Sequence, residues 1–238
     1  MDDVYLFGNG IRVHRAHLLE LQLERYRAPG NPNLHEPVEE EWLLSSFAAD
    51  APQRPVFLDI GAGIGYYSIL VRVRFPAARV VAVDALPRHV AAMRANLAIN
   101  GLSPQDLEII EEAVATCDGN ADFVDSGYGS ALADEARLPL EGRRSIRVPA
   151  RTLATLLDNL PDVHLMKMDI QGAELVVLSA TREALRAGRV RHALIGTHGA
   201  ALHAGVRSVL EESGFTIVVD DPAPPMQPDG IVLGRHRR

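Results

Sequence analysis

The sequence predicts an α/β fold around a mostly parallel β-sheet, and three observations lead to this prediction. From Pro55 onwards, short β-branched runs alternate with longer amphipathic stretches, which is typical of strands joined by crossover helices. The run Val56 to Ile60 leads directly into a turn with three glycines and then into a helical stretch. The connection between the last two strand candidates is too short for a crossover helix, so the final strand is expected to be antiparallel. We therefore expect a three-layer sandwich with helices on both faces of a seven-stranded sheet.

The first 50 residues have a different pattern. A turn at Gly8-Asn9-Gly10 between short apolar runs predicts a small hairpin. Helical patches follow from His17 to Tyr26 and from Val38 to Ala48. We expect residues 1–50 to form an N-terminal cap over the site and residues 51–238 to form the main domain.

The main domain is expected to contain seven strands and four helical stretches. Residues 120–150 are expected to be an irregular insertion with one short strand from Ala121 to Val124. The strand candidates are Val56 to Ile60, Arg79 to Asp84, Leu107 to Ala113, Val163 to Asp169, Val190 to Thr197, Phe215 to Val219 and Ile231 to Gly234. The helical candidates are Tyr66 to Arg74, Pro87 to Asn100, Ala173 to Ala187 and Ala200 to Ser213.

The composition places the chain among globular proteins. Of its 238 residues, 47% are hydrophobic and 23% are charged, which allows a sizeable core. No run approaches the roughly 18 apolar residues of a membrane span, and the acidic start Met1-Asp2-Asp3 is unlike a secretory leader. The single Cys117 excludes an internal disulfide and a cysteine-ligated zinc site. We expect a cytoplasmic protein that does not bind membranes.

The charge balance argues against nucleic acid as a partner. The formal net charge is −7, and the one concentrated basic run is Arg235-His236-Arg237-Arg238 at the end of the chain. A protein that binds nucleic acid usually presents a broad basic surface to the phosphates. The expected partner is therefore a small-molecule substrate.

The turn after the first strand of the main domain carries the strongest chemical signal. Gly61, Gly63 and Gly65 stand at alternate positions between a buried strand and a helix, so a ligand can approach the backbone at the helix N-terminus. A dinucleotide site would need glycine at position 66, where this chain has Tyr66. Asp59 precedes the turn and can accept hydrogen bonds from an ammonium group, whereas it would repel a phosphate.

A second acid, Asp84, ends the next strand 19 residues after Gly65, where a carboxylate can accept both hydroxyls of a ribose. The ligand is therefore expected to carry an ammonium group and a ribose without a pyrophosphate. S-adenosylmethionine meets these conditions, and its adenine would lie at the following strand end. A glycine turn alone would merely tighten a strand–helix connection, but its combination with two acids favours a ligand site. The predicted cofactor contacts are Asp59, Gly61, Ala62, Gly63, Gly65, Asp84, Ala85, Glu112 and Ala113.

Over about residues 36–219, the sequence resembles the FkbM family of S-adenosylmethionine-dependent methyltransferases. The glycine turn is shared by all class I methyltransferases, whereas the Lys-x-Asp-x-x-Gly-Ala-Glu segment from Lys167 to Glu174 is the part specific to this family. The other matching segments are Leu58 to Ser68, Val83 to Ala85, Pro149 to Leu153 and Gly196 to Gly199.

The resemblance implies a Rossmann-like class I methyltransferase fold, with the seven strands in the order 3-2-1-4-5-7-6. It also implies O-methylation of small molecules or sugars, often in secondary metabolism. Two positions depart from the family pattern: Gln171 stands where an acid is usual, and Gly196-Thr197 stand where a glutamate commonly precedes the histidine. These departures concern the orientation of the acceptor more than the binding of the cofactor.

Two residues are candidates for catalysis. Asp169 and His198 each end one of two neighbouring strands at the carboxyl edge of the sheet, so both are expected to face the methyl donor. Because histidine titrates near neutral pH, His198 is expected to take the proton of the acceptor hydroxyl, with Asp169 orienting the acceptor. Asp169 has the alternative role of capping the helix that begins at Gly172, and Lys167 is expected to pair with a nearby carboxylate.

The sequence leaves two further questions open. His35 and Glu36 either cover the site or simply begin the next helix. Asp169, His198 and Glu36 together offer the oxygen and nitrogen ligands that a divalent cation takes, and the sequence leaves its presence unknown.

Other functions compete with methyl transfer to a small molecule. An NAD-dependent oxidoreductase is disfavoured by Tyr66, and a nucleic-acid methyltransferase by the acidic charge and by the lack of an Asn/Asp-Pro-Pro-aromatic run after Asp169. A non-catalytic cofactor-binding protein is disfavoured because both predicted ligand acids, Asp59 and Asp84, are intact. The acceptor pocket would be formed by the cap, residues 120–150 and residues 222–228, none of which carries a readable motif. The sequence does not indicate the oligomeric state.

Overall fold

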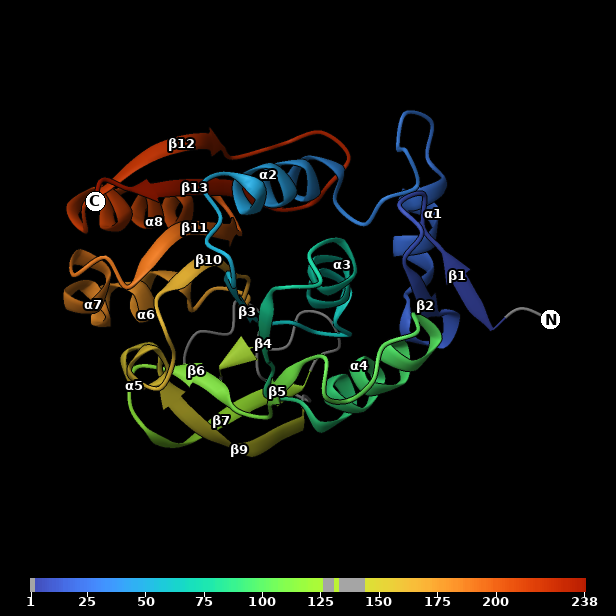
Figure 1. Ribbon diagram of the computed structural model, residues 1–238. Helices are drawn as coiled ribbons and strands as arrows, with labels where there is room; N and C mark the ends of the chain where they lie inside the picture. The colour runs from blue at the N-terminus through green and yellow to red at the C-terminus, as the bar shows by residue number, and fades with distance from the viewer. Residues whose placement is uncertain (1–2, 126–130, 133–143) are drawn as a thin grey trace.

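A seven-stranded sheet forms the centre of the molecule (Figure 1). The computed structural model describes residues 3–125, 131–132 and 144–238. Along the sheet, the strands are β12 (Phe215–Asp221), β13 (Gly230–His236), β11 (Val190–Thr197), β10 (Val163–Met168), β3 (Val56–Ile60), β4 (Arg79–Val83) and β5 (Glu108–Ile110). The strands from β11 to β5 are parallel, whereas β13 is antiparallel to both β11 and β12. When the strands are numbered in chain order and read from β5, the arrangement is 3-2-1-4-5-7-6, so the predicted fold class is confirmed.

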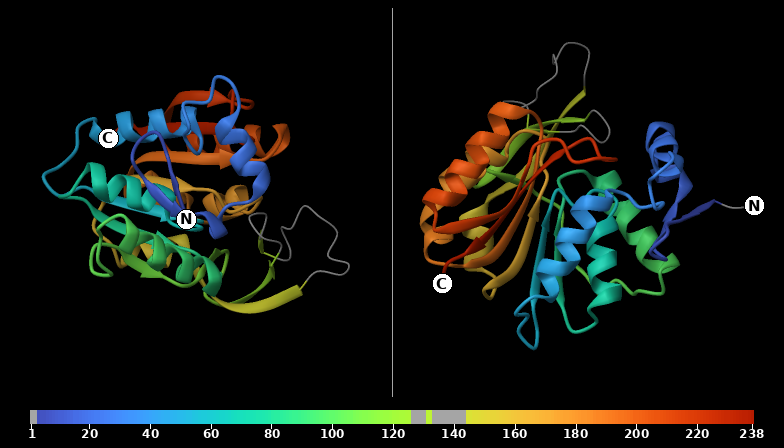
Figure 2. Two further views of the ribbon diagram at one scale, coloured as in Figure 1. Left: turned by 90° about the vertical axis from the view of Figure 1, so that its right-hand side faces the viewer. Right: turned by 90° about the horizontal axis from the view of Figure 1, so that it is seen from above.

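Helices cover both faces of the sheet and give the molecule three layers (Figure 2). Successive strand residues point to opposite faces, so Phe57 packs with the first helical layer and Leu58 with the second. Burial on both faces explains why these strands are continuous apolar runs. The first layer contains α2 (Pro37–Ala48), α3 (Tyr66–Arg74) and α4 (Pro87–Ile99), and the second contains α5 (Leu153–Asp158), α6 (Glu174–Ala180), α7 (Arg182–Arg186) and α8 (Ala200–Glu212).

The single helix predicted from Ala173 to Ala187 is wrong, because the structure has two helices there. Between α6 and α7, the backbone N–H of Thr181 donates to the carbonyl oxygen of Leu178 at 3.1 Å, an i→i−3 bond that tightens the last turn of α6. The Thr181 hydroxyl donates to the carbonyl of Val177 at 2.9 Å. Threonine can satisfy a carbonyl at a helix end with its own side chain, which favours a break at this position.

The N-terminal segment forms a hairpin and a helix at one end of the molecule (Figure 1). Strands β1 (Val4–Leu6) and β2 (Arg12–His14) pair antiparallel in a sheet of their own, followed by the short 3-10 helix η1 (Arg15–His17) and by α1 (Glu20–Arg27). The hairpin is attached to α4, because the backbone N–H of His14 donates to the Asn96 side chain at 3.0 Å. Phe7 and Tyr26 are buried in the same core cluster as α3 and α4.

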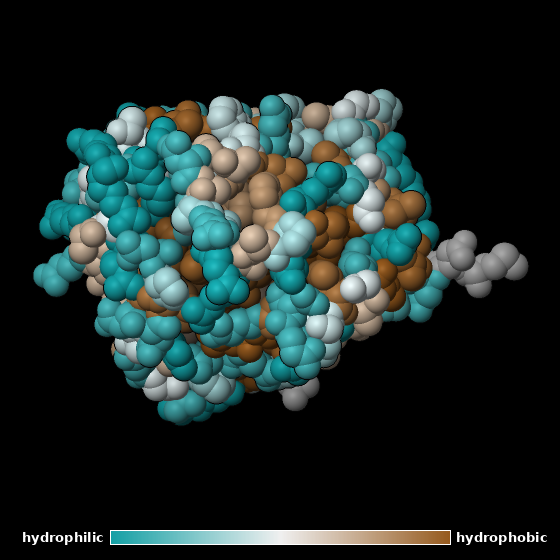
Figure 3. Space-filling model, viewed as in Figure 1, coloured by the Kyte–Doolittle hydropathy of each residue, from teal (hydrophilic) through white to brown (hydrophobic). Residues whose placement is uncertain are grey.

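Hydrophobic side chains also reach the surface in this part of the molecule (Figure 3). Leu6, Leu19 and Leu21 are the most exposed of the large hydrophobic residues among the described positions. By contrast, α2 packs against β10 and β11, and its Leu43 and Phe47 are fully buried. The residues before α2 lie over the end of the first helical layer, whereas α2 itself belongs to that layer.

The irregular insertion predicted for residues 120–150 is wrong for the part that the structure describes. A second sheet lies there in the order β6 (Ala113–Ala115), β9 (Arg144–Thr152), β7 (Gly119–Asp125) and β8 (Ala131–Leu132). Phe123 on β7 and Val148 on β9 pack in a small apolar cluster with Ala85 and Ala113. The predicted strand from Ala121 to Val124 is part of β7, and residues 126–130 and 133–143 of the insertion lie outside the described residues.

None of the helices in the described parts of the chain is both long enough and apolar enough to cross a membrane.

Candidate active site

A cavity opens at the carboxyl ends of β3, β4 and β10, the edge at which open parallel sheets bind their ligands. Residues of the N-terminal segment, of the central sheet and of the second sheet all contribute to its wall. The lining residues are His35, Glu36, Ile60, Gly61, Ala62, Gly63, Ile64, Tyr66, Tyr67, Val83, Asp84, Ala85, Leu86, His89, Glu112, Ala113, Val114, Phe123, Leu132, Lys167, Asp169, Ile170 and Gln171.

The glycine turn between β3 and α3 forms one side of the cavity. Two of its three glycines allow close packing, and the third leaves the backbone open to the cavity. A Cβ atom at Gly61 would lie 1.9 Å from the carbonyl oxygen of Asp169, and one at Gly65 would lie 2.5 Å from Cγ of Met93. Both positions therefore need glycine for close packing against the protein. Gly63 has a φ of 55° and no atom within 4 Å of an added Cβ, so its backbone is open towards the cavity.

Asp84 stands on the cavity wall at the end of β4, as the sequence predicts. Its Oδ2 accepts a hydrogen bond from the backbone N–H of Gly63 at 2.8 Å, and its Oδ1 accepts one from the N–H of Leu86 at 2.9 Å. Nδ1 of His89 lies 3.1 Å from Oδ1. Each carboxylate oxygen has two lone pairs, so Asp84 is held in place and can still accept a hydroxyl.

Asp59 is placed differently from the expectation that it meets an ammonium group. Its side chain is 1% exposed and lies behind the glycine turn, not on the cavity wall. One carboxylate oxygen accepts a hydrogen bond from the Ser68 hydroxyl at 2.6 Å. Burial raises the pKa of Asp59, although the nearby Lys167 ammonium opposes this shift. Among the described residues, its other oxygen has no hydrogen-bond partner.

The end of the cavity beyond Asp84 is mostly apolar. Ala85, Ala113 and Val114 line it together with Phe123 and Leu132 of the second sheet. Glu112, also on this wall, is held by Arg151, whose Nε lies 2.7 Å from a Glu112 carboxylate oxygen. The sequence predicts Ala85, Glu112 and Ala113 here, but it misses Phe123 of β7 and Leu132 of β8.

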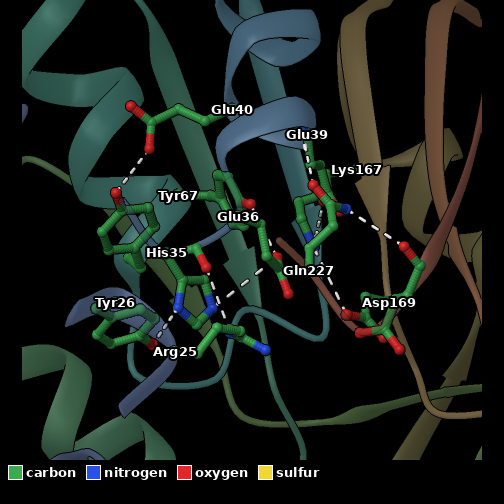
Figure 4. Close-up of polar contacts among 12 residues, drawn as sticks. Arg25, Tyr26, His35, Glu36, Glu39, Glu40, Tyr67, Lys167, Asp169 and Gln227 are labelled. Atoms are coloured by element: carbon green, nitrogen blue, oxygen red, sulfur yellow. Dashed lines mark hydrogen bonds and ion pairs between the residues drawn. The ribbon is translucent and has the colours of Figure 1, made fainter. Parts of the chain in front are cut away.

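The opposite end of the cavity is a dense cluster of charged side chains (Figure 4). Nζ of Lys167 lies 3.1 Å from Oε1 of Glu39, 3.9 Å from Oδ2 of Asp169 and 4.7 Å from the centre of the Tyr67 ring. The predicted pairing of Lys167 with a carboxylate is thus confirmed. Burial alone would lower the pKa of Lys167, but the carboxylates of Glu39 and Asp169 outweigh it and raise that pKa.

Glu39 is the buried partner in this cluster. Its side chain is 1% exposed, and burial raises its pKa, an effect that the nearby Lys167 ammonium opposes. Its backbone N–H donates to the side chain of Gln227 at 3.1 Å, so α2 is joined here to the loop before β13. No sequence pattern predicts this contact, because the two residues are 188 positions apart.

Asp169 lines the cavity at the end of β10. Its Oδ1 accepts a hydrogen bond from the Gln171 amide at 3.0 Å and lies 3.0 Å from Nε2 of His198. The alternative that Asp169 caps the following helix is wrong, because the N-cap residue of α6 is Ala173 and no side chain accepts a capping hydrogen bond there. Glu174 accepts the backbone N–H groups of Ile170 and Gly172, which precede the helix. Burial would raise the pKa of Asp169, but His198 and Lys167 outweigh it and lower that pKa.

His198 follows β11 and lies beside Asp169, as predicted, but its protonation differs from the expectation. Its Nε2 lies 3.0 Å from Oδ1 of Asp169 and its Nδ1 lies 2.7 Å from Oδ1 of Asp229. Burial would lower the pKa of His198, yet these two carboxylates raise it to about 11. Both ring nitrogens of His198 thus face carboxylates, an arrangement that favours the protonated imidazolium and differs from the expectation that this histidine titrates near neutral pH.

His35 and Glu36 both lie on the cavity wall, and α2 begins only at Pro37, so they cover the site. Nδ1 of His35 lies 2.5 Å from the Tyr26 hydroxyl, and its Nε2 lies 3.9 Å from Oε2 of Glu36 (Figure 4). Burial lowers the pKa of His35, which favours the neutral form of this imidazole. Glu36 accepts a hydrogen bond from the Tyr67 hydroxyl at 2.9 Å.

The predicted cation ligands Asp169, His198 and Glu36 do not come together. Among the described residues, the third side chain that could share a metal ion with Asp169 and His198 is that of Asp229, not that of Glu36. The sequence missed Asp229 because it lies in a proline-rich connection and belongs to no recognisable motif.

The fold and this cavity define the class of the protein. A sheet in the order 3-2-1-4-5-7-6, a glycine turn after its first strand and an acid at the end of its second strand are the features of a class I methyltransferase. More narrowly, the chain belongs to the FkbM methyltransferase family, because the family description "Methyltransferase FkbM domain" matches its residues 59–217. It is therefore an S-adenosylmethionine-dependent methyltransferase.

Individual relatives and solved structures agree with this assignment. The chain is 26% identical to methyltransferase sdnD of Sordaria araneosa over 205 residues, which are 72% of this chain and 78% of that protein. The crystal structure of methyltransferase FkbM from Methylobacillus flagellatus KT superposes with a TM-score of 0.55 at 15% identity, over 86% of this chain and 52% of that one. An rRNA methylase from Streptococcus thermophilus superposes with a TM-score of 0.53 at 12% identity, over 85% and 98% of the two chains. At these identities the superpositions show the shared fold.

Proposed function

We propose that this protein transfers the methyl group of S-adenosylmethionine to a hydroxyl of a small molecule or sugar, as a cytoplasmic enzyme of secondary metabolism. The observation that carries the proposal is the division of one cavity into two ends. Asp84 and an apolar wall form one end, and the charged residues Glu36, Lys167 and Asp169 form the other. The first end fits a nucleoside, and the second fits an amino-acid group beside a polar acceptor.

The residues present fit the cofactor. Asp84 would accept the ribose hydroxyls, and the apolar wall at Ala85 and Ala113, bounded by Glu112, would hold the adenine. The turn of Gly61, Ala62 and Gly63 would follow the chain between ribose and methionine. Asp59 and Gly65 would support this turn from behind, because neither lines the cavity. When bound, the cofactor supplies an electrophilic methyl group.

Glu36 takes the role that the sequence assigned to Asp59. Its carboxylate lines the cavity and is only 5% exposed, and the Tyr67 hydroxyl fixes one of its oxygens. A buried carboxylate is stabilised by a positively charged partner. Glu36 would therefore accept hydrogen bonds from the methionine ammonium group.

The acceptor hydroxyl would lie at Asp169, where a fixed carboxylate oxygen can orient it towards the methyl group. An alcohol must lose its proton as its oxygen attacks, and the group that takes this proton must itself be unprotonated. His198 does not meet this condition while both of its nitrogens face carboxylates. His35 meets it in the tautomer whose Nδ1–H donates to the Tyr26 hydroxyl oxygen, because Nε2 then keeps its lone pair and burial favours the neutral ring. We assign His35 as the base, with His198 holding Asp169 in position.

The acidic charge of the chain favours a small molecule over nucleic acid. The test is a methyl-transfer screen with S-adenosylmethionine labelled in its methyl group. It would cover hydroxylated natural products, sugars, the matching amines and total RNA. The proposal expects label in a hydroxylated small molecule, and label found only in RNA or only in the amines would refute it.

A further inference from the structure

Three residues from neighbouring strands meet at the edge of the sheet beside the cavity. Asp169 directly follows β10, His198 directly follows β11 and Asp229 directly precedes β13. These strands are adjacent in the order β13-β11-β10. Because β13 is antiparallel to β11, it begins at the edge where the parallel strands end. The reversed last strand thus brings Asp229 to the two residues that the sequence already singled out.

The three side chains are arranged as a set of ligands. One ligand atom from each residue lies within 4.8 Å of the others, and all three side chains are partly exposed, by 12% to 16%. His198 lies between the two carboxylates, 3.0 Å from Asp169 and 2.7 Å from Asp229. Two carboxylate oxygens and one imidazole nitrogen are donors that divalent first-row metals accept.

The surroundings of these residues favour a positive charge between them. The Glu174 carboxylate adds a third negative group, with Oε1 3.9 Å from Nε2 of His198, and it is fully buried. A Cβ at Gly196 on β11 would come within 3.2 Å of Cγ of Asp169, so glycine leaves room beside that carboxylate. On its other side Asp169 lines the cavity, so an ion bound to it would be open to the acceptor.

We propose that Asp169, His198 and Asp229 bind one divalent cation that also contacts the acceptor hydroxyl, an inference that rests on the proposed function. The cation takes one nitrogen of His198, whose proton leaves to solvent, and an oxygen from each carboxylate. Because Asp169 and Asp229 face opposite ring nitrogens, the carboxylate beside the other nitrogen turns towards the ion. Water fills the remaining positions until the acceptor oxygen replaces one molecule. The ion then lowers the pKa of the hydroxyl, as metals do for bound water. The hydroxyl proton passes to His35, and the C–O bond forms as the methyl–sulfur bond breaks.

Binding is tested first, without cofactor or acceptor. The full-length protein, freed of metals with a chelating resin, is titrated with MnCl₂, and free Mn²⁺ is followed by electron paramagnetic resonance. We expect one site per chain and at least tenfold weaker binding in Asp229→Asn. The matched control is Asp220→Asn, which removes the carboxylate from another histidine–aspartate pair, with His203 at 2.8 Å, and should bind Mn²⁺ as the wild type does.

Turnover is the second readout. Chelation should lower the rate of methyl transfer at least tenfold, and Mn²⁺ or Mg²⁺ should restore it. No binding of Mn²⁺, Mg²⁺ or Zn²⁺ at millimolar concentration, equal Mn²⁺ binding by Asp229→Asn, or full turnover in the chelator would each overturn the cation site. A metal-independent enzyme that methylates a hydroxyl would leave the proposed function standing, whereas Mn²⁺ binding without hydroxyl methylation would remove the proposed function and the contact with the acceptor hydroxyl, and would leave the cation site itself.

Discussion

The two ends of the cavity are built in different ways. The end that we assign to the nucleoside depends mainly on short chain segments, above all the glycine turn and the two residues that follow β4. The charged end draws its side chains from segments as far apart as Glu36, Lys167, His198 and Asp229. Local geometry is sufficient to present a ribose acceptor, whereas setting the charge of a catalytic group requires neighbours that only the complete fold supplies.

The largest effect is expected from the base at the charged end. His35→Gln keeps a polar group near Tyr26 but removes the imidazole, so kcat should fall about 100- to 10,000-fold with the affinity for cofactor little changed. In the wild type, kcat should be level above pH 7 and should fall in acid, because His35 becomes protonated below its lowered pKa.

His203→Gln is the matched control, since this histidine pairs with Asp220 and does not line the cavity. Near-native turnover in His35→Gln would exclude His35 as the base. His198→Gln would then be the next variant to examine.

The buried ion pair at the charged end should matter for stability. Lys167→Met leaves the carboxylate of Glu39 buried without its partner and should lower the free energy of unfolding by about 3–5 kcal/mol. The double variant Lys167→Met/Glu39→Gln should recover most of this loss, because no unpaired charge is left. Urea denaturation of the four proteins in the cycle measures both effects.

The control for the ion pair is Arg79→Met, which breaks the exposed pair with Glu108 and should cost less than about 1 kcal/mol. If Lys167→Met costs no more than Arg79→Met, the buried pair is not a source of stability.

A smaller effect is expected where the charged end meets the cofactor. Glu36→Gln should weaken the binding of S-adenosylmethionine about 10- to 150-fold, the value of a charge-assisted hydrogen bond of about 1.5–3 kcal/mol. Binding of 5′-methylthioadenosine, which lacks the amino-acid group, should stay unchanged. Calorimetry with both ligands measures the difference, and equal losses for the two would show that Glu36 does not contact the ammonium group.

The smallest effect lies away from the cavity and concerns acid stability. Burial lowers the pKa of His192 to about 4, below the value of about 6.5 in the unfolded chain. Its contribution to stability is therefore complete above pH 6.5 and is lost as the pH falls to about 4. His192→Phe should remove part of this dependence, on the order of 1 kcal/mol. Thermal unfolding from pH 8 to pH 4 measures it, and identical slopes in both proteins would contradict the assignment.

The sequence could predict the sheet because both faces of its central strands β3, β4, β10 and β11 are buried, so these strands are continuous apolar runs. The glycine turn and Asp84 could also be predicted, because each performs its role within a short segment of the chain. The second sheet was missed because its two long strands, β7 and β9, are separated by an insertion and carry charges such as Arg147 within their alternation. The protonation of His198 was missed because Asp229 reaches it only through the antiparallel pairing of β13.

The most direct test of the division of the cavity is one comparison of two acids. S-adenosylhomocysteine binding by calorimetry and kcat on an identified acceptor would be measured for Asp84→Ala and Asp169→Asn. Asp84→Ala should weaken binding by about 1–3 kcal/mol, because the ribose hydroxyls lose their acceptor. Asp169→Asn should bind within about threefold of the wild type and lose kcat by at least 100-fold. The roles assigned to the two acids are contradicted if Asp169→Asn weakens binding as much as Asp84→Ala does, or if Asp84→Ala leaves binding unchanged.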